Sequence, residues 1–248
     1  MRLRLVTYNI HRAIGVDRRF RPERIVEVLR DHDPDVVLLQ EVDDGAPRSN
    51  ELDLAKELAE RLEFPNYAVG HNVTLRKGRY GNATLSRFPI LRERNIDLTI
   101  GIRKRRGCQH TTLALGPGPR GARLEVFNLH LGLSARERRQ QIGLLASSRE
   151  FADLDVEQAC IVGGDTNDWR TLLRPFFVDV LDFHCATDHE TRTGPRGIRT
   201  YPSFSPRGSL DKLFLRGPVE PVSVFRCRHR IARVASDHLP VIAELDVG

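Results

Sequence analysis

Several features that would assign a protein class at once are missing from this sequence. Cysteine occurs only at positions 108, 160, 185 and 227, with no C-x-x-C pair and no recognisable zinc-ligand spacing to histidine. This argues against a disulfide framework or a zinc motif and favours a reducing compartment. No apolar run approaches the roughly 18 residues of a membrane span, and the N-terminal apolar run is too short for a signal peptide. We therefore expect a soluble, cytoplasmic protein without a transmembrane segment.

Lysine is also scarce, so the positive charge is almost entirely arginine. The chain has 39 Lys and Arg residues against 33 Asp and Glu residues, a formal net charge of +6. This balance favours an acidic partner such as nucleic acid, anionic lipid or a phosphorylated small molecule. Arginine-rich composition also arises without such a partner, so charge alone leaves nucleic-acid binding open. The basic clusters at 103–106 and 136–139 are expected to be a solvated loop and a solvated helix face.

Strand-like and helix-like apolar patterns alternate along the chain, which predicts a layered α/β architecture. No repeat or linker is visible in the 248 residues, so one domain spanning 1–248 is expected. Helices are predicted at 22–31, 51–62 and 134–151, the last with Ser134 and Glu137 as a capping box. A turn is predicted at 116–121. Strands are predicted at 3–8, 36–39, 81–86, 90–98, 108–115, 123–131, 159–162, 211–216, 222–227 and 241–246.

Polar residues stand at the ends of several of these apolar strands. Four strands run into such residues, and two further strands are preceded by them: Asn9 and His11, Gln40 and Glu41, His130, Asp165 and Asn167, then Asp211, and Asp237 with His238. Any one of them is more commonly a solvated end, a helix cap or a satisfied core residue. Six coincident cases favour a shared site, because strand ends in layered sheets converge on one crevice.

The residue types suit metal-assisted phosphoryl transfer. Carboxylate and amide oxygens are hard ligands that prefer Mg²⁺ or Mn²⁺. A histidine beside a carboxylate is an oriented imidazole that is easily protonated. Catalysis of phosphoryl transfer consists mostly of positioning and charge stabilisation.

Seven segments that contain these polar residues or lie between them resemble, as a set, the endonuclease/exonuclease/phosphatase superfamily. This superfamily includes DNase I, exonuclease III-type apurinic endonucleases, neutral sphingomyelinases and inositol polyphosphate 5-phosphatases. The resemblance spans nearly the whole chain and implies a DNase I-like, four-layer α/β/β/α sandwich of two mixed sheets flanked by helices. The matching segments are TYNIH (7–11), LLQEVD (38–43), GNATLSRFPI (81–90), FNLHLG (127–132), GGDTND (163–168), SLDKLF (209–214) and SDHLPV (236–241).

The resemblance also implies roles for individual residues. Glu41 would be the main ligand of Mg²⁺, or of Mn²⁺ as a substitute, with Asn9 and Asp237 close to the metal. Asp165 would orient or deprotonate the attacking water, and Asn167 would bind the phosphate. His238, oriented by Asp211, would contact the scissile phosphate, and His130 would be a second phosphate-binding histidine or the acid for the leaving group. His11, Asn82 and Arg199 are the expected substrate contacts.

Two departures bear on the substrate. The apurinic endonuclease branch commonly has Asp where this chain has His11 and Tyr where it has His130, which points away from an abasic-site enzyme. The compact chain resembles small bacterial members of unassigned substrate, and no protein partner can be deduced. We expect a metal-dependent phosphodiesterase acting on a small or lipid-like phosphodiester, with a DNA or RNA nuclease as the alternative. A catalytically inactive phosphate-binding module is a second alternative. Loop 192–202 is expected to face the substrate, with its arginines either binding phosphate or only solvating the surface.

Overall fold

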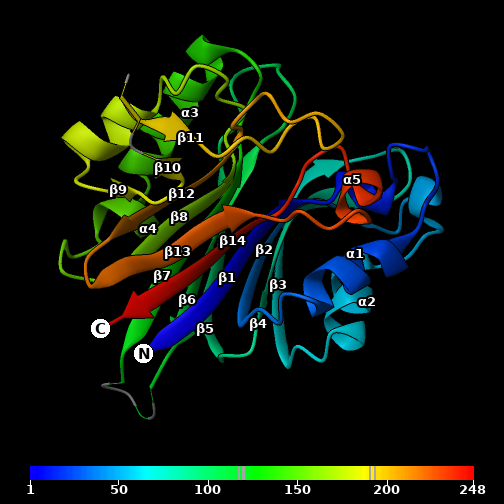
Figure 1. Ribbon diagram of the computed structural model, residues 1–248, viewed down its shortest axis with the longest axis horizontal. Coiled ribbons are helices and arrows are strands. Elements are labelled where there is room, and N and C mark those ends of the chain that lie inside the picture. Colours follow the sequence, from blue (N-terminus) through cyan, green and yellow to red (C-terminus); the bar gives the residue numbers. More distant parts are fainter. Residues whose placement is uncertain (117, 119–120, 190, 193) are drawn as a thin grey trace.

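The computed structural model describes residues 1–116, 118, 121–189, 191–192 and 194–248, and two six-stranded sheets form its centre (Figure 1). The first sheet has the strand order β13-β14-β1-β2-β4-β3 and the second has the order β5-β6-β7-β8-β12-β9. The strands of the first sheet are β1 (Arg2–Asn9), β2 (Val36–Asp44), β3 (Asn66–Thr74), β4 (Arg79–Ser86), β13 (Val219–Arg226) and β14 (Val241–Val247). Those of the second are β5 (Ile90–Asp97), β6 (Gly107–Ala114), β7 (Arg123–His130), β8 (Cys160–Asp165), β9 (His184–Cys185) and β12 (Asp211–Arg216).

Helices cover the outer face of each sheet, as Figure 1 shows. The first sheet carries α1 (Pro22–Arg30), α2 (Leu54–Arg61) and the short α5 (Ala232–Ala235). The second carries α3 (Ala135–Ser147), α4 (Arg149–Ala152) and the π-helical turn η3 (Phe176–Val180). Smaller elements are the 3-10 turns η1 (His11–Ala13) and η2 (Pro47–Ser49) and the two-stranded ribbon β10 (Asp188–His189) and β11 (Arg196–Gly197).

Three apolar cores separate these layers, which explains why strand sequences such as 36–39 are apolar without interruption. In β2, Val36 and Leu38 pack between the two sheets, whereas Val37 and Leu39 pack under α1 and α2. A strand buried on both faces needs apolar residues at every position, because successive side chains point to opposite sides. The third core lies between the second sheet and its helices. The predicted four-layer α/β/β/α sandwich of two mixed sheets is thus confirmed.

Each sheet contains one parallel pair at its centre, and these pairs set the position of the polar residues. β1 runs parallel to β2, and β7 runs parallel to β8. Their flanking strands β14 and β12 are antiparallel to them. The carboxyl ends of the four parallel strands therefore share an edge with the amino ends of the two flanking strands. This is why polar residues stand at or near the carboxyl ends of four apolar runs in the sequence but at the amino ends of the other two. In β2 the strand continues beyond its apolar run to Asp44, so Gln40 and Glu41 lie within it.

The structure departs from the predicted elements in several places, and it adds short elements that were not predicted, such as β9 and α5. The predicted helix 134–151 is broken at Ser148, whose backbone is extended (φ −68°, ψ 146°) and whose hydroxyl donates to the Leu145 carbonyl at 2.7 Å. Ser134 caps α3 by accepting the Glu137 N–H at 3.2 Å, but the Glu137 carboxylate pairs with Arg103. The strand β3 was not predicted, because its sequence NYAVGHNVT lacks a continuous apolar stripe. β3 lies at the edge of its sheet and pairs with a neighbouring strand along one side only. Most of the predicted turn 116–121 lies outside the described residues.

None of the helices in the described part of the chain is both long and apolar enough to cross a membrane.

Candidate active site

Three of the predicted catalytic residues stand in one row across the second sheet. His130 in β7 pairs in register with Asp165 in β8, and Asp165 pairs in register with Asp211 in β12. Residues in register on neighbouring strands project their side chains to the same face of a sheet. The strand pairing alone therefore brings His130 and Asp211, which are 81 positions apart in the sequence, into one row.

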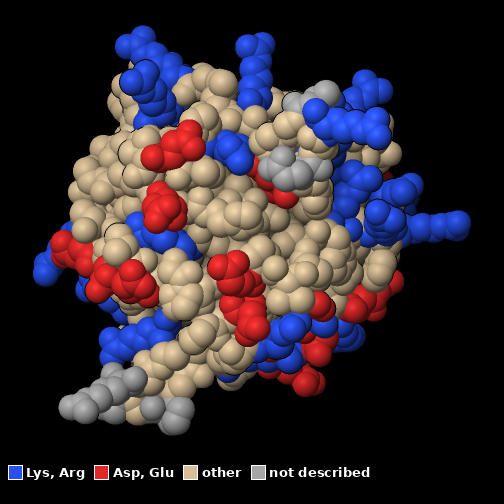
Figure 2. All heavy atoms as spheres, turned by 60° about the vertical axis from the view of Figure 1, so that its left-hand side comes forward, with Lys and Arg blue, Asp and Glu red and all other residues tan. Residues whose placement is uncertain are grey.

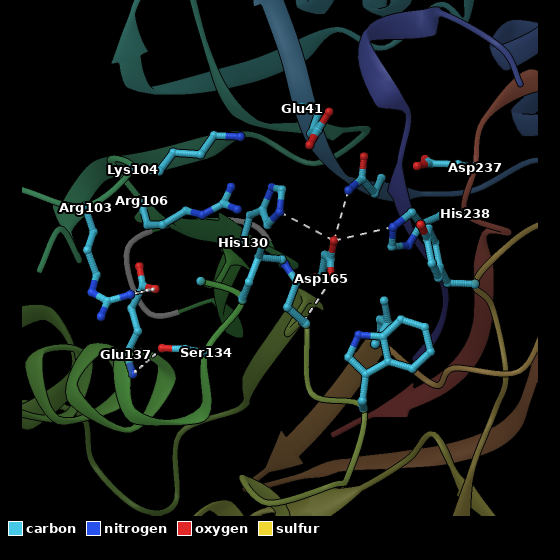
Figure 3. Close-up of a pocket in the computed structure, with 17 residues that line it drawn as sticks. Glu41, Arg103, Lys104, Arg106, His130, Ser134, Glu137, Asp165, Asp237 and His238 are labelled. Atoms are coloured by element: carbon cyan, nitrogen blue, oxygen red, sulfur yellow. Dashed lines mark hydrogen bonds and ion pairs between the residues drawn. The ribbon is translucent and has the colours of Figure 1, made fainter.

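Asp165 is the centre of the site (Figure 3). Its Oδ2 accepts a hydrogen bond from the Asn9 side-chain amide at 3.0 Å and lies 3.5 Å from Nε2 of His130 and 3.6 Å from Nε2 of His238. Its Oδ1 accepts the backbone N–H of Asn167 at 2.9 Å. Residues from both sheets and from the segment before β14 thus converge on one carboxylate.

His238 and Asp211 form a buried pair beside this centre. Nδ1 of His238 lies 2.9 Å from Oδ2 of Asp211, which also accepts a hydrogen bond from the Thr200 hydroxyl. Burial disfavours the charged imidazole, but the two carboxylates of Asp211 and Asp165 outweigh it and raise the pKa of His238 to about 10. His238 is therefore a fixed cation at neutral pH, with Nε2 directed at the centre of the site.

The other two groups in the row are perturbed by their surroundings in different ways. Burial raises the pKa of Asp165 to about 6; attraction to His238 opposes this rise and the neighbouring Asp211 adds to it. Burial, together with Arg106 and Lys104, holds the pKa of His130 well below its usual range. At neutral pH the site thus combines a mostly ionised carboxylate, a cationic histidine and a neutral histidine, a combination typical of functional sites.

Glu41 reaches the same pocket from the first sheet through an irregularity in β2. The pairing of β2 with β4 shifts register between Leu39 and Val42, and Glu41 has a left-handed backbone (φ 58°) within this bulge. Bulges of this kind redirect a side chain next to an active site. The Glu41 carboxylate lines the pocket, and its Oε2 lies 3.5 Å from Nε of Arg12 but is hydrogen-bonded to none of the described residues.

The cavity itself has a volume of about 560 Å³ and contains most of the predicted site residues. Asn9, Glu41, His130, Asp165, Asn167, Asp237 and His238 line it, and Asp211 lies behind His238. The Asn167 backbone is left-handed (φ 50°), and its side-chain amide donates to the Leu131 carbonyl at 2.9 Å. This bond uses one of the two amide hydrogens, which leaves the second hydrogen as a donor and the amide oxygen as an acceptor for a ligand.

The three residues predicted as substrate contacts are not among the described residues that line the cavity. Nδ1 of His11 lies 2.8 Å from the Ile14 carbonyl within η1. Arg199 is exposed, and its backbone carbonyl accepts from Arg226. Asn82 is buried between the sheets. Their positions reflect local turn geometry and sheet packing, which a motif match does not reveal; Thr193 of loop 192–202 lies outside the described residues.

Asn82 instead belongs to a group of buried amides that ties the two sheets together beneath the cavity. Asn128 in β7 donates to the carbonyls of Leu39 and Ala83 in the first sheet at 3.1 and 2.9 Å. Gln40 donates to the Asn128 side chain at 2.8 Å, and Asn82 donates to its carbonyl at 3.0 Å. Buried polar networks of this kind fix a unique packing. They hold Asn9 and Glu41 of one sheet at a set distance from His130 and Asp165 of the other.

Two walls of the cavity contain residues that were not predicted individually, although Tyr201 belongs to loop 192–202, which was expected to face the substrate. Arg103, Lys104 and Arg106 stand beyond His130 on one side (Figure 3), and Arg106 is buried. On the other side the half-exposed Trp169 makes an edge contact with Tyr201, whose ring lies 4.9 Å from that of His238. The prediction of a solvated loop at 103–106 therefore holds for the exposed Arg103, Lys104 and Arg105, but it missed the burial of Arg106 and the contribution of this loop to the cavity.

The second basic cluster was also mispredicted in part. Arg138 is buried, donates to the Leu133 carbonyl at 2.7 Å and forms an ion pair with Asp168 at 3.2 Å. Asp168 in turn accepts the Leu173 N–H at 2.7 Å. This pair links α3 to the segment that follows β8, on which Asn167 and Trp169 lie.

The comparisons with known proteins agree with this geometry. A model of the endonuclease/exonuclease/phosphatase family matches residues 6–238. An uncharacterized protein of Escherichia coli K12, YbhP, is 29% identical over 251 residues, which cover 98% of this chain and 95% of that protein. A crystal structure of an endonuclease/exonuclease/phosphatase from Beutenbergia cavernae superposes with a TM-score of 0.76 at 21% identity, covering 100% of this chain and 72% of that one. The human Nocturnin catalytic domain superposes with a TM-score of 0.76 at 19% identity, covering 100% and 94%.

Proposed function

The chain belongs to the endonuclease/exonuclease/phosphatase family of phosphoester hydrolases, and from that premise we propose that it is an Mg²⁺-dependent phosphodiesterase. The observation that carries the proposal is the convergence of Asn9, His130 and His238 on one oxygen of Asp165. We propose the whole chain, 1–248, as one catalytic domain, because the site takes residues from Asn9 through His238. The four buried free thiols fit the cytoplasmic location expected from the sequence.

The metal is proposed to lie against Glu41, with Asn9 and Asp237 close by. Glu41 lines the cavity, and its buried Oε2, 3.5 Å from Nε of Arg12, is hydrogen-bonded to none of the described residues. Mg²⁺ usually takes one or two protein carboxylates and fills its remaining positions with water and phosphate oxygens. Asp165, Asp211 and His238 also lie close enough together to hold an ion. We favour Glu41, because the protonated His238 has no lone pair to offer and its Nδ1 is held by Asp211.

The protein groups around the cavity suit in-line attack by water on a phosphodiester. When bound, the cation supplies charge stabilisation for the phosphate oxygens. Asp165 holds the attacking water and accepts its proton, since its Oδ2 faces the cavity while its Oδ1 is fixed by the Asn167 N–H. The cationic His238 pairs with a phosphate oxygen. The neutral His130 suits donation of a hydrogen bond to the phosphate better than protonation of the leaving group, because its pKa is low.

The walls of the cavity indicate which substrate groups fit around the phosphate. Lys104 and Arg106 offer positive charge on the side of His130, where a second anionic group of the substrate would lie. Trp169 and Tyr201 offer an aromatic surface on the other side. A cavity of about 560 Å³ holds a small phosphodiester or a lipid headgroup.

A nuclease is the second candidate, because basic side chains beside an aromatic surface also suit a nucleic-acid strand. On the face that Figure 2 shows, however, Lys and Arg side chains stand around the rim with acidic ones among them, rather than forming a continuous basic strip. A protein that binds along the phosphate backbone of a nucleic acid is expected to have such a strip. We place the small phosphodiester first, because a cavity of about 560 Å³ suits a compact substrate.

A substrate panel tests this order of preference. We expect bis-p-nitrophenyl phosphate to be hydrolysed with Mg²⁺ and with Mn²⁺, and plasmid DNA, abasic DNA and RNA to stay intact under the same conditions. Sphingomyelin and inositol phosphates in the same panel separate lipid headgroups from soluble phosphates. Cleavage of DNA, with affinity that falls steeply as salt rises through counterion release, would instead establish the nuclease. Hydrolysis of none of these substrates would favour the inactive phosphate-binding module.

The role of Asp211 predicts a change in pH dependence. In the wild-type protein His238 stays protonated up to about pH 10, so kcat/KM should hold from about pH 7 to about pH 9. In Asp211→Asn the loss of one facing carboxylate should lower the pKa of His238 by about one to three units, and activity should then fall within that range. Below about pH 6 the wild type should lose activity, because the raised pKa of Asp165 leaves its carboxylate protonated there. In Asp211→Asn this loss should begin at a lower pH, because the charge of Asp211 contributes to the raised pKa of Asp165.

Thr200→Val is the matched control for this experiment. It removes the hydroxyl that donates to Asp211 but keeps both charges, so its alkaline limb should stay near that of the wild type. An unchanged profile in Asp211→Asn would show that Asp211 does not set the charge of His238.

A further inference from the structure

A second group of metal-binding side chains lies outside the cavity and is assembled from separate parts of the chain. His32 follows the end of α1, Cys227 follows β13, and His229 precedes α5. One ligand atom from each of the three lies within 4.8 Å of the others. None of the three is among the described residues that line the active-site cavity.

The details of this cluster favour a ligand over simple packing. Nε2 of His32 is buried, yet it is hydrogen-bonded to none of the described residues, and a buried polar atom without a partner is costly. The rings of His32 and His229 face each other with centroids 4.9 Å apart. Cys227 is 1% exposed, and among the described residues its sulfur accepts only the weak hydrogen bond of the His229 N–H at 3.4 Å. An ion between them would satisfy the His32 nitrogen and the sulfur at once.

A carboxylate stands next to this cluster. Oδ2 of Asp31 lies 3.1 Å from Nδ1 of His229. Metal-bound histidines commonly have a carboxylate partner that fixes the ring and strengthens it as a ligand. The same carboxylate offsets the positive charge that an ion would bring.

We propose that His32, Cys227 and His229 form a zinc site, with Asp31 orienting His229. One thiolate and two imidazoles are the donor set of zinc rather than of the hard cation Mg²⁺. Zinc with bonds of about 2.0–2.3 Å holds its donor atoms roughly 3.3–3.7 Å apart, so movements of about 1 Å in the partly exposed imidazoles complete the site. Water fills the fourth position of the tetrahedron. This proposal does not depend on the phosphodiesterase activity.

The position of the site gives it a structural role. The Cys227 N–H donates to the Pro240 carbonyl at 2.9 Å, so Cys227 stands at the base of segment 227–240, which carries Asp237 and His238. An ion shared with His32 links this base to the end of α1. Zinc therefore restrains the segment that supplies part of the active site without entering the cavity.

Zinc binding by the full-length protein tests the proposal directly. The chain is stripped of metals and given one equivalent of Zn²⁺ in excess Mg²⁺, which occupies hard-ligand sites. We expect the wild type to bind about one Zn²⁺ and to melt at a higher temperature with it. Co²⁺ in its place should give the charge-transfer absorption of a thiolate ligand, a readout that needs no variant.

Variants then assign the ligands. Cys227→Ser and His32→Ala should lower zinc affinity by more than about 100-fold, and Asp31→Asn by about 10- to 100-fold. His184→Ala, which removes an exposed histidine elsewhere, should bind zinc as the wild type does. Asp165→Asn should also retain zinc, because it changes only the active site. The proposal is overturned if no zinc binds in excess Mg²⁺, if cobalt shows no thiolate absorption, or if Asp165→Asn abolishes binding.

Discussion

Asp165→Asn should lower turnover by about 10²- to 10⁴-fold, the range that general acid–base groups contribute, and leave the fold intact. Asparagine has the size of aspartate and keeps an oxygen to accept the Asn167 N–H. It cannot take a proton from water, and it removes the negative charge that faces His130 and His238. Steady-state kinetics with bis-p-nitrophenyl phosphate at saturating Mg²⁺ measure the loss.

The same substitution should not reduce stability. Burial raises the pKa of Asp165 from an ordinary value of 3.8 to about 6. Ionisation of this carboxylate therefore destabilises the folded state, with a penalty that begins above pH 3.8 and is complete above about pH 6. Linkage makes this penalty absent at low pH and fully present at neutral pH. Relief of this buried charge offsets the loss of the hydrogen bond that the Asn9 amide donates to Oδ2, so the melting temperature of Asp165→Asn at pH 7 should stay near that of the wild type. Loss of both activity and folding would remove the catalytic assignment.

Asp168→Asn is the matched control for Asp165→Asn, three positions along the same segment. Asp168 is equally buried, but it pairs with Arg138 at 3.2 Å and does not line the cavity among the described residues. Breaking a buried ion pair is destabilising by about 3–5 kcal/mol. This variant should thus lose stability, while its turnover at low temperature stays far above that of Asp165→Asn. The opposite ranking would identify Asp168 as the catalytic carboxylate.

Removal of divalent metal should have the second large effect. EDTA should abolish hydrolysis, and Mg²⁺ or Mn²⁺ should restore it, because the bound cation contributes several kcal/mol of charge stabilisation, equivalent to about 10³-fold or more in rate. Glu41→Gln should raise the Mg²⁺ concentration needed for half-maximal activity and lower the turnover at saturation. Hydrolysis that resists EDTA would rule out a metal-dependent mechanism.

Glu137→Gln provides the control for Glu41→Gln. Glu137 also lines the cavity, but its carboxylate pairs with Arg103 at 3.4 Å, so the Mg²⁺ requirement should not change. EDTA will also strip the proposed zinc site, and the two effects separate on addition of metals. Mg²⁺ alone should restore turnover, whereas one equivalent of Zn²⁺ should restore the melting temperature. An equal Mg²⁺ requirement in Glu41→Gln and the wild type would exclude Glu41 as a ligand.

The sequence by itself determined the layers and most of the site. A strand buried on both faces must be apolar throughout, so the run at 36–39 and the polar Gln40 and Glu41 after it were readable without coordinates. The same holds for Asn9, His130 and Asp165. Their order along the chain carries this information because the carboxyl ends of parallel strands meet at one edge of a sheet.

Tertiary structure alone decided which basic and aromatic groups join the site. Arg106 and Arg138 lie in charge-rich stretches that resemble solvated surface, and only the packing of distant elements buries them. Trp169 and Tyr201 meet through a fold-back of the chain that no local pattern records. Conversely, Asn82 and Arg199 stand in suggestive sequence positions, but neither is among the described residues that line the cavity.

Cys227 shows most clearly the difference between what the sequence determines and what the tertiary structure determines. The sequence gives no zinc-ligand spacing, because His32 is 195 positions from Cys227. Their proximity depends on α1 packing beside the end of β13, a long-range contact that local periodicity does not encode. Hydrophobic periodicity and the residues that favour turns and helix caps determine the local elements. The neighbours of each polar side chain are set by how those elements pack.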